Sequence, residues 1–149
     1  MTLRRMDNVG IVVDDLAAAM AFFVELGLEL EGQAPIEGRW VDQIVGLDGV
    51  RVDIAMMRTP DDHGRLELCK FHSPAAVSAE PKNAPANTLG IRRIMSAVDD
   101  IDDVLVRLRT HGAELVGEVV QYEDKHRLCY LRGPEGILVA LAEQLRRLG

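Results

Sequence analysis

The chain of 149 residues has little that would suit a nucleic-acid-binding or membrane protein. Aromatic residues make up only 4%, and 17 Lys and Arg stand against 24 Asp and Glu, giving a net charge of −7. Phosphates would repel a surface of that sign, and few rings are available to stack on bases. No apolar run approaches the ~20 residues that a membrane-spanning helix needs. We therefore expect neither a nucleic-acid nor a membrane partner.

Cysteine is equally scarce. Cys69 and Cys129 are too few and too far apart in the sequence for a disulfide framework or a zinc knuckle. The charged N-terminal segment is not followed by the apolar core of a signal sequence. These absences predict a domain of the reducing cytoplasm. Its 48% hydrophobic residues suffice for one compact core, and the chain is too short for a separate cofactor domain.

What the sequence does contain is an internal repeat. The segment Val9–Leu16 (VGIVVDDL) aligns with Ile94–Ile101 (IMSAVDDI). The same offset places the G-x-E-L-x-G pattern of Gly27–Gly32 on that of Gly112–Gly117, with no gap between the two matches. Two matching blocks at one offset indicate a duplicated structural module.

Each half predicts the same order of elements. An alternating apolar strand (8–13 in the first half) is followed by a helix that an aspartate caps and a glycine ends. Three further strands follow each helix, near 28–33, 50–58 and 65–71 and then near 114–122, 127–132 and 137–142. An insert at 38–47 is predicted to form a short helix that includes Trp40.

The domain organisation follows from these elements. We predict an α+β fold made of two βαβββ modules, at residues 1–72 and 90–143. A proline- and alanine-containing linker, 73–89, joins them, and 144–149 form a C-terminal tail.

Three segments resemble the vicinal oxygen chelate superfamily, which includes glyoxalase I, bleomycin-resistance proteins and extradiol dioxygenases. They are VGIVVDDLAAAMAFFVELGLEL, its echo IMSAVDDIDDVLVRLRTHGAEL, and YLRGPEGILVALAE, in which Gly133 replaces the usual aspartate. The resemblance implies a cup-shaped mixed sheet in which each module curls into half a cup. It also implies a homodimer, but it does not specify a reaction, because this fold supports many chemistries.

In the resembled family, the first and last strands of each module supply the metal ligands. The corresponding positions here are Asn8, Glu67, Arg93 and Ala140. Only Glu67 matches the usual pattern, Ala140 has no donor atom, and the guanidinium of Arg93 would repel a cation. We therefore expect no metal and no other cofactor, with a divalent metal at this position as the alternative.

The remaining residues suggest an anion site. Strand alternation sends Leu66 and Leu68 to the core and Glu67 to the opposite, cup-side face. The planar donor fork of Arg93 suits a carboxylate, enolate or phosphate, so Glu67 can act as base while Arg93 supports the anion. A purely structural ion pair, or two separate positions, are the alternatives. Further binding candidates are Asn8, Tyr130, Trp40 and Ala140.

Two functions are consistent with these residues. One is a lyase-, isomerase- or dioxygenase-like enzyme with a degenerate metal site that acts on a small anionic metabolite. The other is a metal-free protein that binds or sequesters a small molecule without catalysis, as the resembled resistance proteins do. The acidic composition favours a cationic ligand and Arg93 an anionic one, so the sequence leaves open whether the chain is an enzyme.

Overall fold

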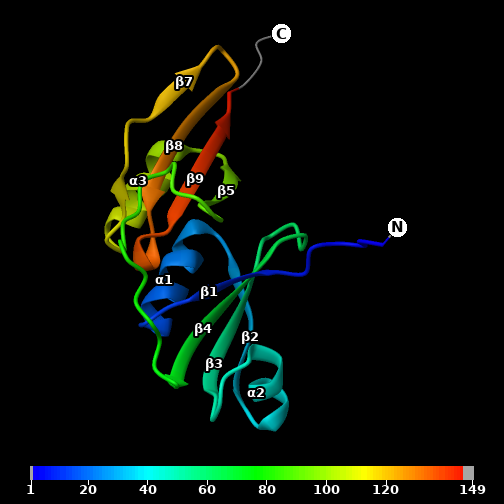
Figure 1. Ribbon diagram of the computed structural model, residues 1–149. Coiled ribbons are helices and arrows are strands. Elements are labelled where there is room, and N and C mark those ends of the chain that lie inside the picture. The colour runs from blue at the N-terminus through cyan, green and yellow to red at the C-terminus, as the bar shows by residue number, and fades with distance from the viewer. Residues whose placement is uncertain (1, 146–149) are drawn as a thin grey trace. The chain divides into compact units, whose positions relative to one another are not determined.

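The computed structural model describes residues 2–145, and the chain divides into two compact units, 1–78 and 79–149 (Figure 1). The boundary falls inside the predicted linker. Each unit contains one mixed sheet, so the predicted α+β fold with two repeated modules is confirmed. None of the helices in the described part is long and apolar enough to cross a membrane.

The first unit has a four-stranded sheet in the order β1-β4-β3-β2, in which only β1 and β4 are parallel. Its elements are β1 (Val9–Val12), α1 (Leu16–Leu26), β2 (Glu29–Glu37), α2 (Arg39–Val45), β3 (Arg51–Arg58) and β4 (Arg65–Ser73). The Asp15 carboxylate caps α1 by accepting from the Ala18 N–H at 3.0 Å. Gly27, at a φ of 124°, ends that helix as the sequence predicts.

The predicted insert helix is α2. Val41 of α2 packs with Val50 and Val52 in a small cluster that also contacts Ile54 and Cys69. The carboxylate of Asp42 accepts hydrogen bonds from the backbone of residues 49 and 50, at 3.0 and 2.8 Å. The insert is therefore fixed against one face of the sheet.

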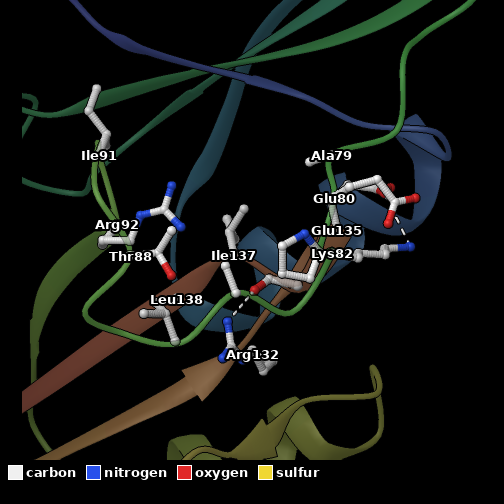
Figure 2. A pocket seen from close by; sticks show the side chains of 13 residues that line it. Ala79, Glu80, Lys82, Thr88, Ile91, Arg92, Arg132, Glu135, Ile137 and Leu138 are labelled. Carbon is white, nitrogen blue, oxygen red and sulfur yellow. Dashed lines mark hydrogen bonds and ion pairs between the residues drawn. The ribbon is translucent and has the colours of Figure 1, made fainter.

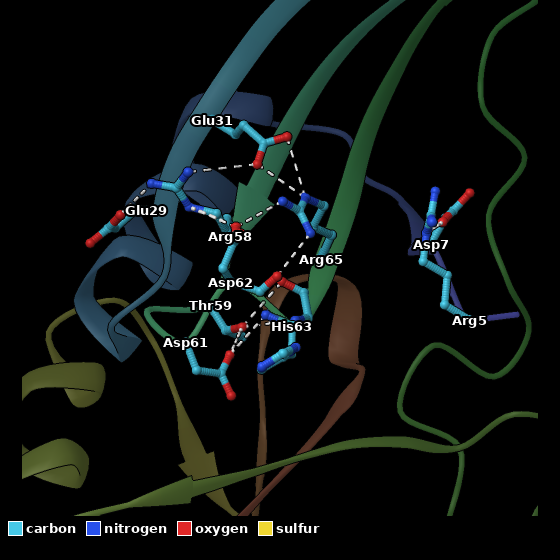
Figure 3. A network of polar contacts seen from close by, with 11 residues as sticks. Arg5, Asp7, Glu29, Glu31, Arg58, Thr59, Asp61, Asp62, His63 and Arg65 are labelled. Carbon is cyan, nitrogen blue, oxygen red and sulfur yellow. Dashed lines mark hydrogen bonds and ion pairs between the residues drawn. The ribbon is translucent and has the colours of Figure 1, made fainter.

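A network of ion pairs fixes the turn between β3 and β4 (Figure 3). Arg58 pairs with Glu29 of β2 at 2.7 Å, and Arg65 pairs with Glu31 at 3.0 Å and with Asp62 at 2.9 Å. The contacts are largely exposed, and each such pair adds little stability in water. Their role here is to hold β2 against the hairpin end.

The second unit repeats this plan in β5 (Arg93–Val98), α3 (Ile101–Arg109), β6 (Glu114–Leu115), β7 (Val120–Tyr122), β8 (His126–Arg132) and β9 (Leu138–Gln144). The strand order is β5-β9-β8-β6, and β7 also pairs with β8. The single strand expected at 114–122 is two short ones, because Gly117 interrupts this edge segment. Strand β9 reaches Gln144, and residues 146–149 of the expected tail lie outside the described part.

Two carboxylates fix α3 to its sheet. The carboxylate of Glu143 in β9 accepts a hydrogen bond from the Ile101 N–H at 2.8 Å, so a side chain of the sheet caps the N-terminus of α3. Arg127 of β8 donates two hydrogen bonds to Asp102, both at 3.0 Å. The hydrogen bond from this guanidinium lowers the pKa of Asp102 below its ordinary value.

Strand register confirms the alignment of the repeat. In the first unit, Gly10 of β1 is the parallel partner of Glu67 in β4. In the second, Met95 of β5 is the parallel partner of Ala140 in β9. The alignment read from sequence pairs Gly10 with Met95, so Glu67 and Ala140 occupy equivalent positions.

Candidate functional site

Glu67 lies in the middle of β4, between two leucines that are buried on the helix side of the sheet. Its own side chain is half-buried on the opposite face. The neighbours across the sheet are Gly10, which has no side chain, and Met56. This orientation is the one that strand alternation predicts.

Cys69 is the next residue on the same face of β4. Its thiol donates to the Glu67 carboxylate, with Sγ 3.4 Å from Oε1. Burial, and then the hydrogen bond and the negative charge of Glu67, raise the pKa of this thiol to about 12. The E-x-C spacing puts both residues on one face, but it does not by itself predict that the thiol and the carboxylate are in contact.

Arg93 opens β5, where its side chain is exposed. Its guanidinium carbon lies 5.4 Å from the centre of the Tyr130 ring, within the range of a cation–π contact. Tyr130 is in turn the cross-strand partner of Ala140, which is fully buried. Three of the predicted site residues of the second unit therefore share one face of its sheet.

The other two candidates lie in the first unit. Asn8 immediately precedes β1 and is exposed. Trp40 lies in the first turn of α2, and 56% of its surface is exposed. No hydrogen bond of either side chain is found among the described residues, so both stay predictions as ligand contacts.

The donors present do not fit a resident metal. Within residues 2–145 no three His, Cys, Asp or Glu side chains gather in a group that could hold an ion. Ala140, which is equivalent to Glu67 in the second unit, offers no donor. A hard divalent cation needs several oxygen ligands, and this set supplies one carboxylate.

Comparison with known proteins agrees with the fold. The family model of the Glyoxalase/Bleomycin resistance protein/Dioxygenase superfamily matches residues 5–141. A solved glyoxalase family protein from Bacillus cereus is 54% identical, with a TM-score of 0.93, covering 98% of this chain and 97% of that one. A comparison with curated proteins gives no match.

More distant solved structures share the fold alone. A glyoxalase family protein from Enterococcus faecalis is 19% identical, with a TM-score of 0.62, covering 96% of this chain and 100% of that one. TnmS3, an antibiotic binding protein from Streptomyces sp. CB03234, is also 19% identical, with a TM-score of 0.58 and coverage of 97% and 98%. The duplicated module, the register of its strands and the match over residues 5–141 lead to one conclusion: the chain belongs to the Glyoxalase/Bleomycin resistance protein/Dioxygenase superfamily.

Proposed function

We propose that this chain binds a small anionic metabolite without a resident metal and acts on it as an isomerase or lyase. Arg93 holds the anion and Glu67 accepts a proton from it. The observation that supports this most is the placement of Arg93. Its exposed guanidinium is held over the ring of Tyr130, on the strand that is equivalent to β1 of the first unit.

The contact with Tyr130 prepares Arg93 for an anion. The guanidinium lies over the ring of Tyr130, which limits the freedom of a long side chain. The N–H groups of a guanidinium point outward in its plane, where they can donate two parallel hydrogen bonds to a carboxylate or phosphate. Less entropy is lost when the ligand binds, because the cation is already positioned.

Glu67 has the features of a proton acceptor. Among the described residues of its own unit it has no ion pair, and the hydrogen bond that it accepts from Cys69 comes from a neutral donor. Gly10 beside it leaves space above the sheet, because no atom lies within 4 Å of the position that a Cβ would take. A ligand atom can therefore approach the carboxylate.

The proposed step is removal of a proton next to a carbonyl group. The proton passes to the Glu67 carboxylate, the electron pair of the C–H bond forms a carbon–carbon double bond, and the π pair of the carbonyl group moves to its oxygen to give an enolate. Arg93 stabilises that oxyanion by donated hydrogen bonds and by its positive charge. Returning the proton to a different position gives an isomer, and loss of a neighbouring leaving group gives a lyase product.

A second candidate is binding without catalysis. TnmS3, which shares this fold, is an antibiotic binding protein. A protein that sequesters a small molecule needs neither a metal nor a catalytic step. The net charge of −7 favours a cationic ligand under this hypothesis, whereas the enzyme hypothesis requires an anionic one.

One experiment separates the two. A panel of small carboxylates, phosphates and cationic compounds is screened by thermal shift, and each ligand found is incubated with the protein in D₂O. The enzyme hypothesis predicts an anionic ligand whose α-proton exchanges, and predicts that Glu67→Gln stops the exchange while Arg93→Met stops binding. Arg109→Met, at the exposed end of α3, is the control for loss of a positive charge. A ligand that binds without exchange supports the second candidate.

We also propose that the chain forms a closed, two-fold symmetric homodimer, as its family resemblance implies. Exposed apolar side chains on α2, including Trp40 and Ile44, are consistent with a covered surface. Light scattering at micromolar concentration should give twice the 16.4 kDa mass of one chain. A monomeric mass would contradict this proposal.

A further inference from the structure

The second unit contains a cavity that the proposed function does not use. Its volume is about 230 Å³, and it lies between the end of the linker and the turn that joins β8 to β9 (Figure 2). Arg92, Thr88 and Ile91 lie on one side, and Glu80, Lys82 and Glu135 on the other. Arg93, Tyr130 and Ala140 are not among the residues that line it.

One nitrogen of the Arg92 side chain, at this cavity, has no hydrogen-bond partner. This nitrogen, Nε, is buried. No carboxylate of the described residues forms an ion pair with the guanidinium of Arg92. A buried donor without an acceptor is rare in native structures. The other nitrogens of the guanidinium are not buried in this way, and they line the cavity without an acidic partner in the described part of the chain, so a ligand can supply one.

The charges around the cavity favour a single negative charge. Lys82 and Glu135 form an ion pair at 3.4 Å and largely offset each other. Arg132 donates to the Gly136 carbonyl at 3.0 Å and adds a second guanidinium to the wall. Three cationic and two acidic side chains line the cavity in all, an excess of one positive charge.

The remaining wall is apolar, and its shape is fixed. Ile91, Ile137 and Leu138 contribute hydrocarbon surface. The linker packs closely on the turn at Gly136, since a Cβ there would lie 2.7 Å from the Lys82 carbonyl oxygen and would also collide with Asn83. A volume of about 230 Å³ is below that of pockets for drug-sized ligands, which run to roughly 300–1,000 Å³.

From these features we infer a second ligand site, in which Arg92 binds the carboxylate of a short-chain monocarboxylic acid. The two Nη groups of Arg92 donate side by side to the two carboxylate oxygens. Arg132 and the hydroxyl of Thr88 add polar contacts, and the alkyl chain lies against Ile137 and Leu138. The site is separate from Arg93, and Arg109 at the exposed end of α3 serves as the control for loss of a positive charge.

The test is a titration of the ¹⁵N-labelled full chain with butyrate, followed by calorimetry and by the arginine Nε–H signals. Binding should saturate at one butyrate per chain and shift one arginine Nε–H signal, which is absent in Arg92→Met. Arg92→Met should weaken binding by about tenfold or more, the effect of losing charged hydrogen bonds. Arg92→Lys should weaken it similarly, because an ammonium group cannot donate in a planar pair. Arg109→Met should leave it unchanged.

Several outcomes would overturn the inference. Butyrate binding that is lost in Arg93→Met and kept in Arg92→Met would place the anion at the proposed catalytic residues instead. Inorganic phosphate binding more tightly than butyrate would contradict a monocarboxylate site. No saturable binding up to high millimolar butyrate would show that the cavity is not a site for this class. Arg92→Lys keeps the charge and the side-chain length, so it provides the comparison if Arg92→Met does not fold.

Discussion

The thiol of Cys69 donates a hydrogen bond to the carboxylate of Glu67 along one face of β4, with Sγ 3.4 Å from Oε1. The contact has two consequences for the site. It orients the carboxylate that we propose as the base, and together with burial, which is the largest cause, it raises the pKa of the thiol to about 12. A protonated thiol is a poor nucleophile, so Cys69 supports Glu67 and does not replace it.

The reactivity of Cys69 follows from this. In a Cys129→Ser background, which leaves Cys69 as the one cysteine, alkylation by iodoacetamide at pH 8 should be much slower than that of a free thiol. Glu67→Gln should accelerate it, because the carboxylate is one cause of the raised pKa. The rate should still be below that of a free thiol, because burial is the largest cause. Alkylation of the Cys129→Ser protein as fast as that of glutathione would contradict the structure.

The same pKa predicts a dependence of stability on pH. Above pH 9.0, the ordinary value for cysteine, the unfolded chain loses the Cys69 proton, whereas the folded chain keeps it up to about pH 12. The unfolded state then binds fewer protons, so the free energy of unfolding decreases as pH rises across this window. In urea titrations between pH 8 and pH 10.5, Cys69→Ser should lose less stability than wild type. Equal slopes for the two proteins would contradict this.

A third prediction concerns Gly136, at the turn between β8 and β9. Its φ is +75°, and a Cβ would meet the linker at Lys82. Gly136→Ala should therefore cost about 1–2 kcal/mol for the left-handed backbone and about 1–3 kcal/mol more for the forced contact. Gly112→Ala is the control, because Gly112 also has a positive φ, +85°, but nothing lies within 4 Å of its Cβ position.

Urea unfolding of the two variants measures the difference. Gly136→Ala should be clearly the less stable protein, and its linker should become more sensitive to protease near Lys82. Equal losses in the two variants would mean that the linker does not pack against this turn.

Much of the fold could be predicted because the repeat is visible in the residues themselves. The alternation of side chains along the strand gives the orientation of Glu67. The constant offset between the two halves of the repeat places Ala140 at the position equivalent to Glu67, as the strand registers confirm. The contact of Arg93 with Tyr130 could not be predicted, because it depends on which hairpin register brings β8 beside β9. The cavity at Arg92 could not be predicted either, because it exists only where the linker folds back on the β8–β9 turn.

A fourth prediction is that untagged, purified protein contains no stoichiometric metal at the Glu67 position. The reason is the donor set, in which Glu67 is the one carboxylate, Arg93 is a cation and Ala140 has no donor atom. Elemental analysis should find well below one Zn, Mn, Ni or Fe per chain. One metal per chain that disappears in Glu67→Ala would restore a metalloenzyme.

In the proposed function Arg93 and Glu67 act on the same anion, and a double-variant cycle measures whether they do. The dissociation constant of the anionic ligand found by the screen is measured for wild type, Arg93→Met, Glu67→Gln and the protein with both changes. The proposed function predicts that Arg93→Met weakens binding by about tenfold or more, and that the effect of Glu67→Gln depends on which residue is present at position 93. Effects that simply add, or unchanged binding in Arg93→Met, would contradict it.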